Sequence, residues 1–311
     1  MRRLIVPLAL GFCACSEYDV TRSQKTDAWT QADRDVDVDI LWVLDNSGSM
    51  SEEHASLAEH AEAFTGTLSA AGLEFRIGLA DTDPADGGLL LGETMDEETS
   101  GLTEAFARQV SEAGTSGTRV EEGFATAILA ASPLVNTTFA RDDADLELVV
   151  YSDEDDQSAL EVADFLDDLG ATHPGHDVHV NTIVGDLPSG CASAVAAADA
   201  GVRYGEARDT SGGIRESICT VDMDGVLERM AHRVIGLETE FYLSDLPLLN
   251  TLEVAVDGVV VPYRDVDGWR YEGAKNAIAF DGWAIPRPGS KISANYFNWT
   301  GGPLPDTGAA E

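Results

Sequence analysis

The chain has 311 residues, long enough for one sizeable domain and a second, smaller one. Lysine and arginine together number 19, and aspartate and glutamate 56, which gives a formal net charge of −37. Such an acidic surface repels nucleic-acid phosphates and anionic lipid headgroups, which argues against binding to either, whereas it suits metal cations and basic partners. The general alternative is that the acidic side chains provide solubility in a high-salt habitat.

Residues 1–15 have the pattern of an export signal. Two arginines precede an apolar run over residues 4–12, which is too short to span a bilayer, and a Cys-Ala-Cys sequence follows. The segment resembles a bacterial lipoprotein signal, which implies that Cys15 becomes the lipidated first residue of an exported protein of the cell envelope, at the outer membrane. Phe12 departs from the small or aliphatic residue usual at its position. Residues 16–35 are polar and aperiodic, so we expect a flexible tether whose lipid is the only membrane anchor.

The first predicted strand of the following domain is Ile40–Leu44. This short, continuous apolar run is typical of a strand that is covered on both faces in a parallel sheet. Residues 51–68 repeat apolar side chains at helical spacing. The loop between them therefore lies at the carboxyl end of a strand and the amino end of a helix, where open α/β sheets bind ligands.

Asp45, Ser47 and Ser49 alternate along this loop, so that their side chains can converge on one point. One carboxylate and two hydroxyls suit a hard cation such as Mg²⁺, which prefers an octahedron of oxygens. In the alternative interpretation Ser49 and Glu52 form a helix capping box, and Asp45 and Asn46 are ordinary turn residues.

Further strands and helices alternate along the chain, and two polar turns border them. The strands are expected at 75–79, 146–151 and 178–184, and the helices at 103–113, 120–128, 158–169 and 226–234. Thr118 precedes one of these helices in a Ser-Gly-Thr turn, and Asp153 follows the strand 146–151. The alternation predicts a doubly wound α/β domain over residues 36–236 with a mainly parallel sheet.

Two other clusters admit a metal interpretation. The acidic turn 81–88 could suggest calcium, but its aspartates do not have the EF-hand spacing, and an acidic turn is the simpler interpretation. His173, His176 and His179 could suggest zinc. Pro174 breaks any helix that would align them, which favours a loop.

Cys191 and Cys219 are the only cysteines after Cys15. In an exported protein two such residues most simply pair, so we predict a disulfide between them. Between them, residues 202–204 look like a short edge strand.

Residues 237–311 change to alternating hydrophobicity with frequent turn signals, which predicts a small antiparallel β domain. Asp257-Gly258, between two apolar segments, is a strong hairpin signal. The domain carries several aromatic residues that could form either its core or a binding surface: Trp269, Trp283, Tyr296 and Trp299.

The Asp-x-Ser-x-Ser pattern after an apolar strand resembles the metal-ion-dependent adhesion site of von Willebrand factor A domains. Members of that family add a threonine from a later glycine-flanked loop, matched here by Thr118, and an aspartate that ends the next core strand, matched by Asp153. The resemblance implies that Ser47 and Ser49 contact the cation directly and that Thr118 does so in one conformation. It implies that Asp45 and Asp153 act largely through water.

The resemblance implies a binding or adhesion module in which a divalent cation, Mg²⁺ or alternatively Ca²⁺ or Mn²⁺, captures a carboxylate of a protein partner. Two alternatives are a metal-dependent hydrolase and a structural envelope protein whose metal only ties loops together. An enzyme is not expected, because the sequence has no Gly-x-Ser-x-Gly elbow and no phosphate-binding loop. The sequence indicates no oligomeric state.

Overall fold

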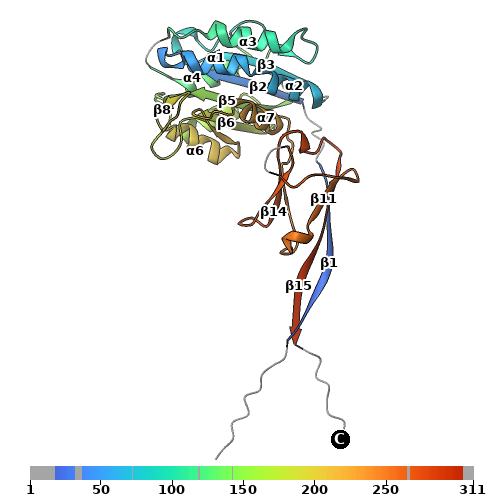
Figure 1. The fold of residues 1–311 in the computed structure, drawn as a ribbon. Coiled ribbons are helices and arrows are strands. Elements are labelled where there is room, and N and C mark those ends of the chain that lie inside the picture. Colours follow the sequence, from blue (N-terminus) through green and yellow to red (C-terminus); the bar gives the residue numbers. More distant parts are fainter. Residues whose placement is uncertain are drawn as a thin grey trace, which may run out of the picture.

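The computed structural model describes residues 18–31, 37–71, 73–117, 120–141, 143–264 and 267–303. They form an α/β domain and a β domain, from which a long two-stranded ribbon extends (Figure 1). Cys15 and Thr118 lie outside the described residues.

A six-stranded sheet with the order β4-β3-β2-β5-β6-β9 forms the centre of the α/β domain. Its strands are β2 (Asp37–Leu44), β3 (Phe75–Asp81), β4 (Met95–Asp96), β5 (Ala144–Ser152), β6 (Val178–Val184) and β9 (Arg215–Ser217). All neighbouring strands run parallel except β4, which pairs antiparallel with β3 at one edge. This confirms the predicted α/β fold with a mainly parallel sheet.

The burial of β2 explains its continuous apolar sequence. Ile40, Trp42 and Leu44 belong to the core on one face of the sheet. Leu41 and Val43 belong to the core on the other face. Because both faces are covered, both sets of alternating positions between Ile40 and Leu44 are apolar.

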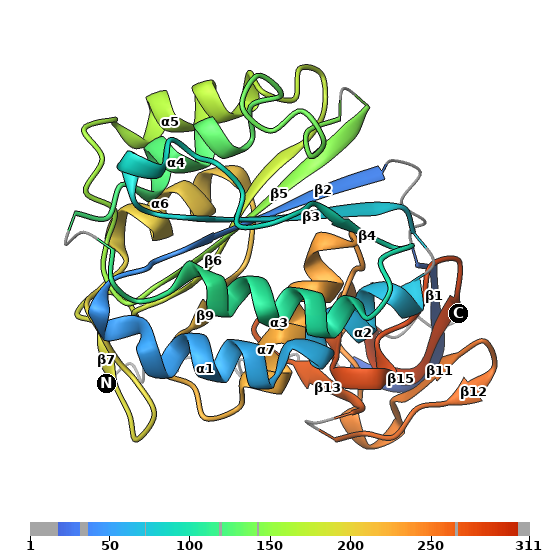
Figure 2. The same cartoon turned by 90° about the horizontal axis from the view of Figure 1, so that it is seen from above.

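Helices cover both faces of the sheet (Figure 2). One face carries α1 (Ser51–Glu59), α2 (Ala61–Ala71), α3 (Leu102–Ala113) and α7 (Met223–Val234), and the other α4 (Gly123–Ala130), α5 (Val162–Gly170) and α6 (Val202–Ser211). Trp42 meets Phe64 and Phe106 edge-on at ring-centroid distances of 5.0 and 5.4 Å. Across the sheet, Phe124 stacks on Phe165.

The prediction of a short edge strand at residues 202–204 is wrong, because these residues begin α6. The carboxylate of Asp155 accepts a hydrogen bond from the backbone N–H of Arg203 at 3.0 Å. This contact satisfies an N–H group that a helix leaves unpaired at its first turn. The partner comes from a distant loop, so the local sequence pattern could not indicate it.

The β domain consists of two antiparallel sheets. One contains β1 (Tyr18–Thr30), β15 (Lys291–Pro303), β11 (Glu253–Val256) and β12 (Val259–Val260), and the other β10 (Glu240–Tyr242), β14 (Ala277–Phe280) and β13 (Trp269–Glu272). Asp257 and Gly258 have φ values of 49° and 80°, which a tight hairpin turn requires, and they connect β11 to β12 as predicted. Trp269 and Tyr296 are buried in the core, whereas Trp299 is exposed.

The prediction of a flexible tether over residues 16–35 is wrong for its central part. Residues 18–30 form β1, which pairs with β15 along its whole length, from Tyr18 opposite Pro303 to Thr30 opposite Lys291. Figure 1 shows the two strands side by side in the ribbon. Backbone hydrogen bonds hold this strand in place, so it needs no apolar periodicity. Within the described part of the chain, no helix has the length and apolar character needed to cross a bilayer.

Candidate functional site

The loop that follows β2 is fixed by the side chain of Asp45. The backbone N–H of Asp45 donates to the carbonyl of Tyr151 at 2.9 Å, which extends the pairing of β2 with β5. Its fully buried carboxylate accepts the N–H of Ser47 at 2.8 Å and the hydroxyl of Ser152 at 2.6 Å. Asp45 therefore joins the carboxyl ends of two neighbouring parallel strands.

The structure brings Ser47, Ser49 and Asp153 to the same place. The hydroxyl oxygens of Ser47 and Ser49 lie 2.9 Å apart. The Ser49 hydroxyl also hydrogen-bonds the carboxyl of Asp153, whose Oδ1 is buried and has no hydrogen-bond partner within the described part of the chain. Asp45, Ser47, Ser49 and Asp153 thus form a cluster, hereafter the Asp45 site.

The capping-box alternative differs from the structure. The residue that caps α1 is Met50, which makes no side-chain capping hydrogen bond. The hydroxyl of Ser49 instead faces Ser47 and Asp153. The side chains of this loop therefore converge on one another and not on the helix backbone.

The Asp45 site is strongly acidic. Burial, together with the nearby carboxylates of Asp45, Glu53 and Glu154, raises the pKa of Asp153 to about 6, although the hydrogen bond from Ser49 acts in the opposite direction. Burial also raises the pKa of Glu53. Clustered buried carboxylates repel one another, and a cation between them would remove this repulsion.

One acidic residue next to the Asp45 site was missed by sequence reasoning. Glu121 is fully buried, accepts a hydrogen bond from the Thr82 hydroxyl and contacts the carboxyl of Asp45. Burial raises its pKa to about 7. In the sequence, Glu121 is one of two adjacent glutamates at the start of the helix expected at 120–128, and no pattern distinguishes it from Glu122.

The donor set fits a hard divalent cation. It offers carboxylate and hydroxyl oxygens, which are the ligands that Mg²⁺, Ca²⁺ and Mn²⁺ prefer, and it contains no sulfur or imidazole. Two buried carboxylate oxygens, Asp153 Oδ1 and Glu121 Oε1, have no hydrogen-bond partner among the described residues. Asp156 has a different role, because it pairs with Arg203 at 3.1 Å and accepts the N–H of Phe124 at 2.9 Å.

The three histidines lie near the amino ends of the strands, far from the Asp45 site at the carboxyl ends. Each histidine faces its own carboxylate. His173 approaches Asp39 at 3.5 Å, and His179 approaches Glu147 at 3.2 Å. His176 approaches Asp145 at 3.6 Å. In the part of the chain that the structure describes, no group of three or more histidine, cysteine, aspartate or glutamate side chains is placed to hold a metal.

The predicted disulfide is confirmed. Cys191 in β7 (Cys191–Ala192) bonds to Cys219, which follows β9, with an S–S distance of 2.05 Å. The bond closes a loop that contains β8 (Ala197–Ala198) and α6.

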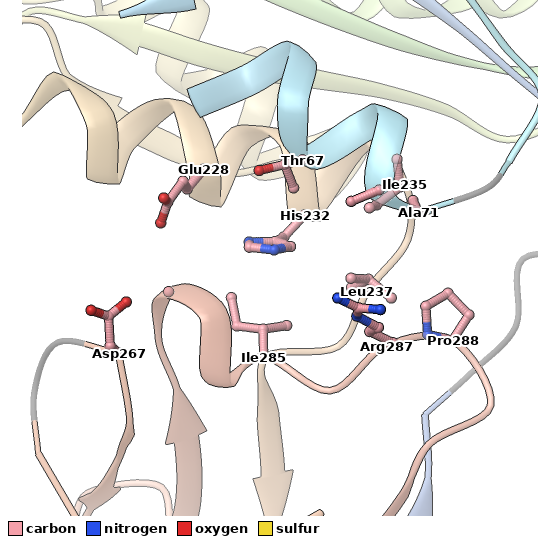
Figure 3. Close-up of a pocket in the computed structure, with 12 residues that line it drawn as sticks. Thr67, Ala71, Glu228, His232, Ile235, Leu237, Asp267, Ile285, Arg287 and Pro288 are labelled. Carbon is pink, nitrogen blue, oxygen red and sulfur yellow. The ribbon is translucent and has the colours of Figure 1, made fainter. Parts of the chain in front are cut away.

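A pocket of about 270 Å³ lies where the two domains meet, and the residues of the Asp45 site do not line it. Its walls come from α2, α7 and the β domain, with apolar side chains such as Ile285. Figure 3 shows His232 pointing from α7 into the pocket, with Glu228 on the same helix and Asp267 across from it.

Burial lowers the pKa of His232 from 6.5 to about 4. The unfolded chain therefore binds a proton below pH 6.5 that the folded protein does not bind until about pH 4, so stability is lost as the pH falls through this range. Between pH 7 and pH 5 we expect the wild type to lose about 2 kcal/mol of unfolding free energy more than His232→Gln. Urea denaturation at both pH values measures this difference. Equal losses in the two proteins would contradict the burial of a neutral His232.

No protein-family model and no curated protein matches the sequence. Similar solved structures include the pilus adhesin SpaC from Lactobacillus rhamnosus GG in an open conformation, with 10% identity and a TM-score of 0.48 over 97% of this chain and 44% of that chain. A von Willebrand factor type A protein from Catenulispora acidiphila has 11% identity and a TM-score of 0.42, over 92% of this chain and 66% of that chain. Proximal thread matrix protein 1 from the mussel byssus, with a zinc-occupied adhesion-site motif, has 11% identity and a TM-score of 0.42, over 70% and 52%. This chain spans less than half the length of the SpaC structure. Structures similar to this chain thus include von Willebrand factor A proteins and pilus adhesins.

Proposed function

We propose that the protein is a metal-dependent binding or adhesion module of the cell envelope. In this proposal a divalent cation, most suitably Mg²⁺, is held by Asp45, Ser47, Ser49, Thr118 and Asp153 and captures an acidic group of a partner. The supporting observation is the convergence of Asp45, Ser47, Ser49 and Asp153, with a buried Asp153 oxygen for which the residues that the structure describes supply no hydrogen-bond partner.

The burial pattern of the loop suits capture from solution. Asp45 and Asp153 are buried beneath the loop, whereas Gly48 and Ser49 are exposed. A bound cation would supply an electrophilic coordination position that a partner carboxylate can fill. Asp45 would supply charge and, through its hydrogen bonds to Ser47 and Ser152, fix the loop in place. The proposal assigns no catalytic role to these residues.

We also propose that the protein is exported and that Cys15 carries a lipid. Cys15 precedes β1 by only a few residues. The ribbon of β1 and β15 extends away from the α/β domain (Figure 1). Its 13-residue strands span roughly 40 Å, so the ribbon would hold the Asp45 site away from the membrane surface.

Partner capture tests the proposed function. Immobilised wild type in Mg²⁺ is expected to retain a partner from envelope extracts and to release it when EDTA or excess acetate is added. Asp45→Asn is expected to retain no partner. Asp167→Asn, which removes an exposed carboxylate on α5, is expected to behave as the wild type. Equal retention with and without EDTA would contradict the proposal, and metal-dependent turnover of ester or phosphate substrates would favour the hydrolase alternative.

A further inference from the structure

A second pocket, of about 420 Å³, lies beside α1 and is hereafter called the α1 pocket. Residues of α1 form one wall, the hairpin of β7 and β8 forms another, and the segment that follows β9 forms a third. The disulfide joins the last two walls, because Cys191 begins the hairpin and Cys219 lies in the segment after β9. The volume lies within the range of pockets that hold small ligands.

The α1 pocket offers exposed apolar surface to a ligand. Val195, in the turn of the hairpin, is 44% exposed, and Val221 is 79% exposed. Ile218 and Met223 also line the pocket and are buried. An apolar stem that fills the pocket would remove this surface from water, which favours its binding.

Three glutamates of α1 line the same pocket. They are Glu52, Glu53 and Glu59, and no lysine or arginine of the described residues lines it with them. The ion pairs that join described residues include none of these glutamates. The electrostatic potential at the pocket is therefore negative, which attracts a cationic group and repels an anionic one.

Glu53 supplies a buried carboxylate to this pocket. Its side chain is 6% exposed, and its Oε2 makes no hydrogen bond to any described residue. The hydroxyl of Tyr151 donates to the Glu53 carbonyl at 3.0 Å, which holds the first turn of α1 against β5. A buried carboxylate oxygen without a partner is costly, because it has lost its water and gained nothing in return. An ammonium group would offset the charge and donate a hydrogen bond to this oxygen.

The α1 pocket and the Asp45 site are neighbours. Glu53 lines the pocket, and its carboxylate is close enough to those of Asp45 and Asp153 to repel both. One partner segment can therefore reach the pocket and the site together.

We propose that the α1 pocket binds an ammonium group on an aliphatic stem, as a lysine side chain of the partner presents it. In this arrangement the stem lies against Val195 and Val221, and the ammonium group reaches Glu53. The inference rests on the proposed function, in which the Asp45 site captures an acidic group. The partner then carries an acidic group and a lysine side chain next to each other.

NMR titration of the full chain with hexylammonium, in the presence of EDTA, tests the pocket without any contribution from a metal. We expect saturable shifts of the amide signals of Val195 and Val221. Hexanol has the same stem without the charge, and methylammonium has the same charge without the stem. Each is therefore expected to bind at least about tenfold more weakly than hexylammonium. Hexanoate, whose charge is reversed, is expected not to bind.

Two variants separate the charge of the pocket from its apolar surface. Glu53→Gln keeps the shape and removes the charge, so we expect it to weaken hexylammonium binding by at least about tenfold. The matched control is Glu206→Gln, which removes an exposed carboxylate on α6 and should keep the wild-type affinity. Val221→Ser, at an exposed position, should weaken the binding of hexylammonium and leave that of methylammonium unchanged.

The outcomes separate this inference from the proposed function. Equal affinity for hexylammonium and methylammonium, or equal affinity in Glu53→Gln and Glu206→Gln, would overturn the inference, because binding would then reflect the general acidity of the protein. Equal affinity for hexylammonium and hexanol would overturn it as well, since the charge would play no part. A wild type that binds Mg²⁺ but not hexylammonium would overturn this inference alone. Binding of hexylammonium without binding of Mg²⁺ would contradict the proposed function and, with it, the neighbouring acidic group of the partner.

Discussion

Serine at both Cys191 and Cys219 is expected to lower the free energy of unfolding by about 3 to 4 kcal/mol. The bond joins residues 28 positions apart in the sequence. Opening a loop of this length restores conformational entropy to the unfolded chain, which accounts for this magnitude. The loop contains α6, whose Tyr204 and Ala207 pack in the core beside the sheet, so its mobility should rise as well.

Urea denaturation of the oxidised wild type, the reduced wild type and the double serine variant measures this effect. The reduced wild type isolates the bond, because it keeps both sulfur atoms, including that of the buried Cys219. We expect it to unfold at a urea concentration close to that of the serine variant and well below that of the oxidised protein. Coincident unfolding curves for oxidised and reduced protein would show that the bond contributes no stability.

The parts of the fold that were predicted correctly are those whose structure is determined by residues close together in the sequence. β2 and β5 are buried on both faces, and each contains a short continuous apolar run, Ile40–Leu44 in β2 and Leu148–Tyr151 in β5, that is recognisable in the sequence. The turn at Asp257-Gly258 needs positive φ at both positions, which this residue pair tolerates.

The geometry of the site could be predicted because the carboxyl ends of neighbouring parallel strands lie next to each other at the same end of the sheet. In the pairing of β2 with β5, Leu44 lies opposite Tyr151, so the residues that follow the two strands must be neighbours. Asp45 and Asp153 therefore meet, although more than a hundred residues separate them. Their role as cation ligands stays a prediction.

The errors concern residues whose structure depends on a distant partner. Residues 18–30 are polar, and their strand exists because β15, at the other end of the chain, provides the hydrogen bonds. Residues 202–204 begin a helix because Asp155 accepts the N–H of Arg203. Glu121 reaches the Asp45 site because Thr82, from another loop, holds its carboxylate. No periodicity or spacing in the sequence encodes these contacts.

Asp45→Asn is expected to lower the affinity for Mg²⁺ by at least about a hundredfold, because it removes a buried carboxylate at the centre of the site. The amide oxygen can still accept one of the two hydrogen bonds that come from Ser47 and Ser152. The variant should therefore fold, and without metal it should be at least as stable as the wild type, since it relieves repulsion with Asp153 and Glu121.

The control for this variant must remove one negative charge elsewhere. Asp155 is unsuitable, because its carboxylate holds the first turn of α6. Asp167 is exposed on α5, so Asp167→Asn changes the net charge by the same amount without touching the site. Any loss of affinity common to both variants would then reflect the overall acidity of the protein.

Isothermal titration of Mg²⁺ into metal-free wild type, Asp45→Asn and Asp167→Asn tests the central claim most directly. We predict one binding event of similar affinity in the wild type and Asp167→Asn, and none that can be measured in Asp45→Asn. Equal Mg²⁺ affinity in all three proteins would contradict a cation site at Asp45 and would leave the loop after β2 as a turn without metal chemistry.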